Sequence, residues 1–427
     1  MASGEVFEAR KASAAPETVA GRVSTQSGKR KARTSKPSKT PAASLETLTD
    51  GKEKVVKQHL KAQRTTKSYD GHVARGREFL AKQCELGRRT KGSLLDDPEF
   101  ELAFSDKPNK HSPEALVFYL TQKGFVEELS MSTIDCIYSA FKDFWTHLAG
   151  SKYRGEWGYD EKAKEWRGNP ADSAEVQDLR TALKHKVKAD GRIRNHAVAM
   201  SYEYMQTIMA WSERECPAEM CCRAPSSMEE RTKVTKHLRL RAFASTGFTL
   251  FARNNEMTNL RRNDVTFGCR GPPPYHQEHI KVTLAQRKGW QHRTDKNPEA
   301  DGQTYHIYDQ PTKHAINSFV HLKNYTEYLE KYHGDMKPTD YIFPMLGSSG
   351  VLQPGSPISN EAVQEMLDWA VSGSGIPEKL SSHCFRRGGA QYRFMFAPIG
   401  ERWTLARIRW WGGWAPGESV RRTCTVH

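Results

Sequence analysis

A short segment, SSHCFRRGGAQYRF, combines one histidine with two adjacent arginines. In a helix, His383, Arg386 and Arg387 would stand at i, i+3 and i+4 and share one face. Guanidinium groups hold phosphate oxygens through paired hydrogen bonds, and imidazole can transfer a proton near neutral pH. The segment is compatible with a site for phosphate chemistry, but taken alone it favours a solvated basic face, so the evidence for a site must come from other segments.

Two further segments carry residues that suit the same chemistry. TGFTLFARNNEMTNLRRNDV places Arg253 before Glu256, Leu260 and Asp264, and RIRWWGGWAPGE contains Trp414. Arginine is a second anion clamp, and an indole N–H can donate a hydrogen bond to a phosphate oxygen. The structural alternatives are a pair between Arg253 and Glu256 and a place for Trp414 in the core.

These segments belong to a region, residues 201–427, with mixed elements. HLRLRAFASTGFTLFARNNEMTNLRRNDV has the pattern of a helix that leads into a second helix, whereas HIKVTLAQRKGW and QTYHIYDQ alternate like strands. HAINSFVHLKNYTEYLEKYH and NEAVQEMLDWAVSGSG are amphipathic helices. Gly388 and Gly389 are poor helix residues, so they predict close packing of another element. The predicted fold class is mainly α with a small antiparallel β-sheet (α+β).

The preceding part of the chain divides into three predicted regions. Residues 1–51 have almost no large apolar side chains and are expected to form a disordered basic tail. Residues 52–175 have apolar residues three and four apart and predict a small helical DNA core-binding domain. Asp172 or Ser173, at its end, is a candidate cap for a helix that runs into the basic residues that follow. Residues 176–200 are interpreted as a basic linker along DNA, with a charged helix facing solvent as the alternative. Its basic residues are Lys184, Lys186, Lys188, Arg192 and Arg194.

The charge balance indicates a polyanionic partner. Lysine and arginine outnumber aspartate and glutamate by 65 to 50, which gives a formal charge of +15 over 427 residues. Such an excess attracts nucleic acid at long range. GKRKARTSKPSK, in the tail, suits a nuclear import signal or a nonspecific phosphate-binding arm, with a solubilising tail as the alternative. With the import signal, we expect a nuclear protein. We expect no membrane partner, because no stretch approaches the ~20 apolar residues that span a bilayer.

The cysteines do not predict a metal site. Eight are spread along the chain without the dense spacing of a disulfide scaffold, so reduced thiols are expected. Cys216, Cys221 and Cys222 cluster in ECPAEMCC. Because two of them are adjacent and no second ligand pair follows at zinc spacing, we expect no bound metal there.

The three chemical segments resemble the active-site boxes of the tyrosine recombinases. The segment around Arg253 resembles the first box, SHCFRRGG resembles the His-x-x-Arg box, and RIRWWGGWAPGE resembles the region just beyond it. They occur in the family's order, after a helical basic domain and on either side of a predicted hairpin. HCFRRGGAQYRF, RWWGGW and the GNPADS linker are similar to the recombinases of Crypton-type DNA transposons and their domesticated relatives.

The resemblance implies an enzyme of DNA integration and recombination that uses no cofactor and no small-molecule substrate. In this family a tyrosine attacks a DNA phosphodiester, and a DNA hydroxyl later resolves the covalent link. Arg253 and Arg386 would neutralise the charge on the phosphorane, His383 would transfer a proton and Trp414 would hydrogen-bond the phosphate. Arg387 would add a DNA contact.

The resemblance also implies a hairpin lysine that protonates the leaving sugar oxygen. Lys288, at the end of the first predicted strand, is our choice. Lys281 and Lys296 are the alternatives, because the predicted hairpin is longer than the family usually has.

The family's nucleophile has no counterpart at its expected place. The sequence contains no tyrosine after Tyr392, which we interpret as a packing residue. Cys424 and Thr425 lie near the expected place but lack the paired base of an evolved nucleophile. We therefore expect a C-terminally truncated or degenerate catalytic domain that binds DNA but is deficient in cleavage.

The expected partner is double-stranded DNA, with a homo-oligomer on DNA as a further expectation. The main alternative is a noncatalytic architectural or kinetochore-like DNA-binding protein on the same fold. RNA binding is a weaker alternative.

Overall fold

The computed structural model describes residues 44–59, 61, 63–87, 97–148, 150–190, 198–284, 287 and 304–414. The chain divides into two compact units, residues 1–193 and 194–427, and each has its own apolar core. The mainly α class with small antiparallel sheets is confirmed. Within the described ranges, none of the helices combines the length and the apolar character needed to cross a membrane.

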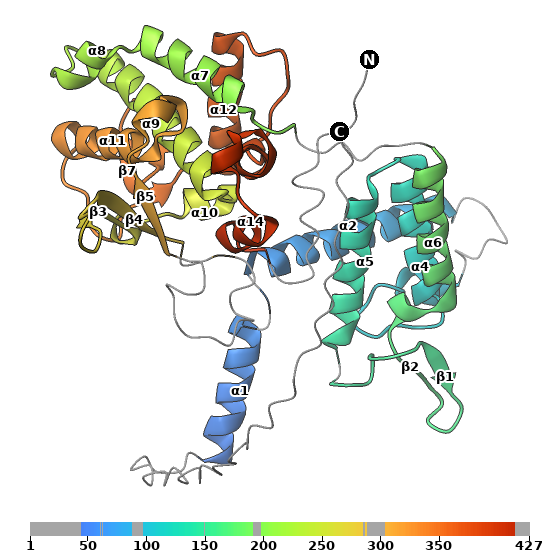
Figure 1. Cartoon of the computed structure of the whole chain (residues 1–427). Helices are drawn as coiled ribbons and strands as arrows, with labels where there is room; N and C mark the ends of the chain where they lie inside the picture. The colour runs from blue at the N-terminus through green and yellow to red at the C-terminus, as the bar shows by residue number, and fades with distance from the viewer. Residues whose placement is uncertain are drawn as a thin grey trace, which may run out of the picture. The chain divides into compact units, whose positions relative to one another are not determined.

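The first unit is helical, as predicted (Figure 1). Its helices are α1 (Leu45–His59), α2 (Gln63–Gly87), α3 (Pro98–Glu101), α4 (Ser112–Thr121), α5 (Met131–Thr146) and α6 (Ala174–Ala189), with a π-helical turn η2 (Gln122–Val126) and a 3-10 turn η3 (Pro170–Asp172). α2 packs on α5, and α4 packs on α6. Gly76 makes the first of these contacts close, because a Cβ there would lie 2.5 Å from the ring of Phe141. Phe141 is fully buried, with its ring centroid 4.6 Å from that of Phe104.

Helix α6 corrects the predicted linker at 176–200. Ser173 caps a continuous helix through Ala189, in which Val176 and Leu183 are buried in the core of the unit. Lys184 and Lys188 are exposed, and Lys186 lies 2.8 Å from Asp190. These residues fit the alternative of a charged helix with one solvent face. Arg192 and Arg194 lie outside the described residues.

Two smaller features of the first unit also differ from prediction. Residues 158–167 contain an antiparallel hairpin, β1 (Gly158–Asp160) and β2 (Glu165–Arg167), which the turn residues around it obscured. The predicted tail, 1–51, overlaps the start of α1 at Leu45. Residues 1–43, including GKRKARTSKPSK, lie outside the described part.

The second unit is built around α9 (Met228–Leu250) (Figure 1). Its other helices are α7 (Tyr202–Glu215), α8 (Ala218–Cys222), α10 (Asn254–Thr258), α11 (Ser318–His333), α12 (Asn360–Ser374), α13 (Cys384–Gln391) and α14 (Leu405–Gly412). Short helical turns are η4 (Arg262–Asp264), η6 (Pro311–Ile316), η7 (Tyr392–Phe396) and η8 (Ile399–Glu401). The helices predicted from HLRLRAF, HAINSF and NEAVQEM are confirmed as α9 with α10, α11 and α12.

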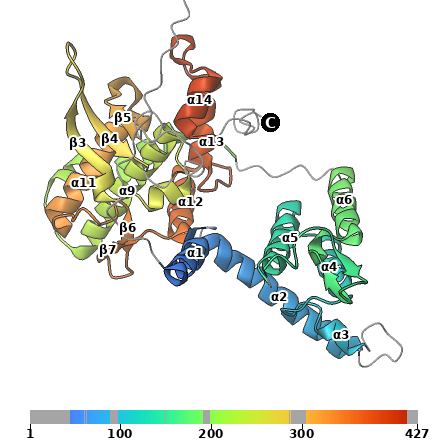
Figure 2. The same cartoon turned by 90° about the horizontal axis from the view of Figure 1, so that it is seen from below.

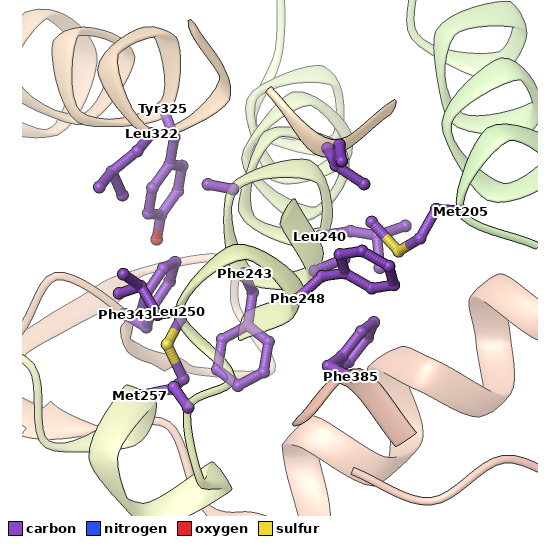
Figure 3. Packing of buried hydrophobic residues seen from close by; sticks show 14 of the residues in the cluster. Met205, Leu240, Phe243, Phe248, Leu250, Met257, Leu322, Tyr325, Phe343 and Phe385 are labelled. Carbon is purple, nitrogen blue, oxygen red and sulfur yellow. The ribbon is translucent and has the colours of Figure 1, made fainter. Parts of the chain in front are cut away.

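Helix α9 is enclosed by its neighbours because it is buried all round. Every residue from 237 to 248 is buried, and α7, α11, α12 and α13 all contact the helix. Figure 3 shows Phe243 and Phe248 of α9 beside Phe385 of α13, with Tyr325 of α11 on another side. The central helix therefore holds its end, where Arg253 follows, in a fixed place.

The predicted strand pair lies in a three-stranded antiparallel sheet in the order β3–β4–β5. The strands are β3 (Val265–Arg270), β4 (Glu278–Thr283) and β5 (Thr304–Tyr308), of which β3 was not predicted. Ile280 and Val282 of β4 are fully buried, whereas Lys281 between them pairs in register with His306 of β5. A separate pair consists of β6 (Pro344–Leu346) and β7 (Leu352–Pro357).

Helices α13 and α14 are in contact, and two glycines let α13 approach the core closely (Figure 2). A Cβ at Gly388 would lie 1.9 Å from the carbonyl oxygen of Met200, and one at Gly389 would lie 2.0 Å from that of Phe248. The predicted close packing at these glycines is confirmed. It places the start of α13 against the end of α9.

We expect Gly388→Ala to destabilise the second unit by about 3 kcal/mol, because the new methyl group overlaps a backbone oxygen that cannot move freely. Differential scanning calorimetry of the full chain should show a lower transition temperature for that unit. Gly400→Ala is the matched control, since nothing lies within 4 Å of its Cβ position. Equal transition temperatures for the two variants would contradict the close contact.

Candidate functional site

The site begins where α9 ends. Phe251 has left-handed backbone angles (φ 48°, ψ 40°) and terminates the helix, which leaves carbonyl oxygens of its last turn without helical partners. The Nη1 of Arg386 donates to the carbonyl of Phe251, and the Nη2 of Arg287 lies 3.5 Å from the carbonyls of Leu250 and Phe251. Two guanidinium groups thus satisfy this helix end, where positive charge is favourable.

The same two arginines also hold the end of α14. The Nη2 of Arg386 donates to the carbonyl of Gly412 at 2.9 Å, and the Nη1 of Arg287 donates to that of Trp411 at 2.7 Å. The guanidinium of Arg386 lies 4.0 Å from the centre of the Trp414 ring, a cation–π contact. Both arginines are only 2% exposed. They therefore join two helix ends that are about 160 residues apart in sequence.

Two glycines permit this arrangement at the end of α14. Gly413 has a positive φ of 61°, and a Cβ there would lie 2.6 Å from the Nε of Arg287. A Cβ at Gly412 would overlap the ring of Trp414. The WGGW sequence thus lets the chain turn back so that Trp414 covers Arg386.

Arg253 lies beside this arginine pair and is held by a buried carboxylate. Glu256 accepts a hydrogen bond from the backbone N–H of Arg253 and another from its Nη1, both at 2.8 Å. The Nε of Arg287 lies 3.7 Å from the same carboxylate. The side chain of Arg253 is 21% exposed, more than that of Arg287 at 3%. The predicted alternative of an Arg253–Glu256 pair is present, and it leaves part of the guanidinium facing solvent.

His383 lies at the N-cap of α13 and is exposed, whereas the helix turn that follows it is buried. Desolvation of its imidazole, followed by the positive charges of Arg386, Arg253 and Arg387, lowers the pKa of His383, while the charge of Glu256 acts in the opposite direction. The contact of α13 with α9 and the hydrogen bond from Arg386 to the carbonyl of Phe251 bring the segments around 253 and 383 together. A lowered pKa keeps His383 neutral at pH 7.

The structure brings together Arg253, His383, Arg386 and Trp414, but it places two of them differently from the prediction. Arg386 is buried, with both Nη atoms on main-chain carbonyls, and Trp414 is 8% exposed beneath it. Arg387 is also buried, at 9% exposure, and does not offer the surface expected of a DNA contact. The i, i+3, i+4 spacing predicted that these side chains lie close together, but it did not predict that Arg386 and Arg387 face the interior.

The hairpin lysine is not located by the described residues. Lys288 and Lys296 lie outside the described part of the chain. Lys281 is on β4, on the opposite face from Ile280 and Val282. Arg287, next to Lys288, is the residue that sequence reasoning missed, because a single arginine beyond a strand end has no spacing pattern that predicts burial.

Tyr392 is a packing residue, as predicted. It is 5% exposed, and its ring stacks on that of Tyr202 with centroids 5.0 Å apart and planes inclined by 22°. Its ring centroid also lies 5.9 Å from that of Phe248. Burial raises the pKa of Tyr392, which opposes its use as a nucleophile.

Two groups outside this site carry metal-binding residue types. The Sγ atoms of Cys216 and Cys221 lie 3.6 Å apart, but within the described residues these thiols belong to no set of three potential ligands. In the first unit, Asp97, Glu99 and His111 bring ligand atoms within 4.8 Å of one another. Asp97 is already paired there with Lys110 at 2.8 Å and with His111 at 3.0 Å.

Comparison with known proteins gives similar solved structures only. The sequence matches no family model and no curated protein. One similar structure is the XerH site-specific recombinase bound to difH substrate in a pre-cleavage complex, with 13% identity over 81% of this chain and 73% of that chain and a TM-score of 0.44. The XerA recombinase has 12% identity over 84% of this chain and 94% of that chain, with a TM-score of 0.34.

A third similar structure is a lambda integrase dimer bound to a COC' core site. It has 11% identity over 86% of this chain and 95% of that chain, with a TM-score of 0.40. All three TM-scores are below 0.5, so the function proposed for this chain rests on its own side chains.

We expect Arg253→Gln to raise the pKa of His383 toward its ordinary value of 6.5, because one positive charge near the imidazole is removed. Since folding lowers this pKa, protonation of His383 opposes the folded state as the pH falls below 6.5. NMR titration of histidine-labelled full chain, with His383→Gln to assign the resonance, measures the shift.

Arg214→Gln is the control for this titration, because that arginine is 69% exposed and is not among the groups that affect His383. An unchanged His383 midpoint in Arg253→Gln would contradict the proximity of the two segments.

Proposed function

We propose that this chain binds double-stranded DNA at a backbone phosphate, is related to the tyrosine recombinases and is of the Crypton type. The observation that carries the proposal is the meeting of Arg253, His383 and Arg386 in one cluster. These are the residues that match the family's boxes, and 130 residues of sequence separate the first from the second. A shared location is what phosphate recognition needs from them.

In the proposed complex, Arg253 and His383 contact the phosphate directly. Glu256 orients Arg253 and leaves guanidinium N–H groups for an anionic oxygen. Neutral His383 exchanges a proton or donates a hydrogen bond. The positive potential comes from four guanidinium groups against one carboxylate, namely Arg253, Arg287, Arg386 and Arg387 against Glu256.

The proposal includes binding without strand cleavage by this 427-residue chain. The family's covalent step needs a tyrosine beyond the His-x-x-Arg box, and the sequence has none after Tyr392. Tyr392 itself is buried by packing. Nothing else at the site supplies an activated nucleophile among the described residues.

A noncatalytic architectural DNA-binding protein is the second candidate, and the state of Arg386 favours it. Both Nη atoms of this arginine bind main-chain carbonyls, and Trp414 covers the group. Arg386 thus has a structural use that does not require a catalytic one. The two candidates share DNA binding. They differ in whether the cluster keeps a catalytic use, which would require that another protein chain supplies the tyrosine.

Nuclear localisation is part of the proposal and rests on GKRKARTSKPSK, with six basic residues in twelve. A fluorescent protein fused to these residues should accumulate in the nucleus, whereas a fusion with the basic residues changed to alanine should not.

We expect Arg253→Ala to weaken duplex DNA binding about tenfold and to lower the slope of log K against log salt by about 1, because one phosphate contact is lost. Fluorescence anisotropy with a labelled duplex between about 50 and 300 mM salt measures both quantities. Arg214→Ala is the matched control, being an exposed arginine of the same unit. Identical affinities and slopes for the two variants would overturn the proposed site, and preferential competition by duplex RNA would overturn the choice of DNA.

Cleavage is tested separately with a nicked suicide duplex and a denaturing gel. No covalent protein–DNA adduct is expected from the chain. An adduct would contradict the absence of cleavage while leaving DNA binding intact.

A further inference from the structure

A groove of about 490 Å³ opens on the side of α14 near β5 and η7. Its walls are rich in aromatic rings, namely Tyr305, Tyr308, Trp403, Trp410 and Trp411. Trp410 is 41% exposed, so part of its ring faces the groove side of α14.

The groove is also basic. The guanidinium of Arg407 lies 4.3 Å from the centre of the Trp403 ring, and that of Arg393 lies 5.3 Å from the same centre. Arg393 is anchored by a 2.8 Å hydrogen bond to Gln310, whereas Arg407 is exposed. None of the described residues that line the groove is acidic.

The rear wall is held in place by hydrogen bonds. The Nε1 of Trp411 donates to the carbonyl of Thr249 at 2.8 Å, and the hydroxyl of Tyr305 donates to the carbonyl of Trp411 at 2.9 Å. Trp411 also makes edge-on contacts with Tyr305 and Trp403, with centroids 4.9 and 5.0 Å apart. The groove is therefore preformed rather than made by loose side chains.

The groove and the phosphate site share α14. The carbonyl of Trp411 that accepts from Tyr305 also accepts from Arg287 at 2.7 Å. Gly412, the next residue, binds Arg386. A ligand in the groove would thus contact the same short helix whose carbonyl end is held by Arg287 and Arg386.

We propose that this groove binds one unpaired nucleotide of DNA, whose base stacks on Trp410 and whose phosphate contacts Arg407. Aromatic rings stack any base, and arginines beside them attract the phosphate. The volume of about 490 Å³ is enough for a single nucleotide and too small to enclose a duplex. Arg407 supplies exposed positive charge, whereas the charge of Arg393 is partly offset by the carboxylate of Glu401, 3.8 Å away. The inference rests on the proposed function, because it names the form of DNA that the protein prefers.

The expected gain is about tenfold in affinity for DNA with one unpaired nucleotide over a perfect duplex, in line with the stacking of a single base on an aromatic side chain. The measurement is anisotropy with the full chain, a duplex with a one-nucleotide bulge, the same duplex without it, and a single strand. Trp410→Ala should abolish the gain and leave the affinity for the perfect duplex unchanged.

Two variants control this result. Trp369→Ala removes a tryptophan of similar exposure, 37%, from α12 outside the groove, and should keep the gain. Trp410→Phe retains an aromatic ring and should restore most of the gain, which excludes misfolding as the cause of the loss in Trp410→Ala.

Iododeoxyuridine at the bulge, after irradiation, should crosslink to the peptide that carries Trp410. A crosslink confined to another peptide would overturn the inference.

The outcomes separate this inference from the proposed function. Equal binding of bulged and perfect duplexes, with Arg253→Ala weakening both, would overturn the groove and retain the phosphate site. If neither duplex binds, the proposed function fails, and the single strand decides the groove: binding that Trp410→Ala weakens supports it, and no such effect overturns it.

Discussion

The second unit depends on guanidinium groups that satisfy the carbonyl end of α9. A helix that is buried all round cannot leave its last carbonyls to water, so the protein supplies donors from elsewhere in the chain. Arg287 comes from beyond β4 and Arg386 from α13. Both also donate hydrogen bonds to carbonyl oxygens at the end of α14. The same device recurs at α7, where the Nη2 of Arg241 donates at 2.6 Å to the carbonyls of Ser212 and Cys216. Buried arginines thus act as connectors between elements as well as charges.

This constraint explains why positive charge gathers where the proposed phosphate site lies. The donors used at this helix end are arginines, which bring positive charge with their N–H groups, and Glu256 offsets only part of that charge. Arg253 and His383 lie in the positive electrostatic potential of these arginines because they border the same helix end. The same arginines therefore stabilise the fold and attract anions. A substitution that removes one of them would lower both the stability of the unit and its affinity for an anion.

Much of this arrangement could be predicted from the sequence because it depends on spacing and residue type. The resemblance of the segments around Arg253, His383 and Trp414 to a family's active-site boxes implied that they meet, and the low helix propensity of Gly388 and Gly389 predicted the close packing of α13. The burial of Arg386 could not be predicted, since spacing defines a face but not what covers it. For α6, the weight given to its lysines hid the apolar period of Val176 and Leu183. Arg287 has no local pattern at all, because its role comes only from tertiary contacts.

The guanidinium of Arg386 already donates to two carbonyl oxygens, those of Phe251 and Gly412, and the ring of Trp414 covers it. An incoming phosphate oxygen at Arg386 would have to displace the carbonyls of Phe251 and Gly412, so its capture would be an exchange of ligands with little net gain in energy. Such an exchange would release the carbonyl end of α14 from Arg386, so an anion bound at that arginine would loosen the connection between the ends of α9 and α14.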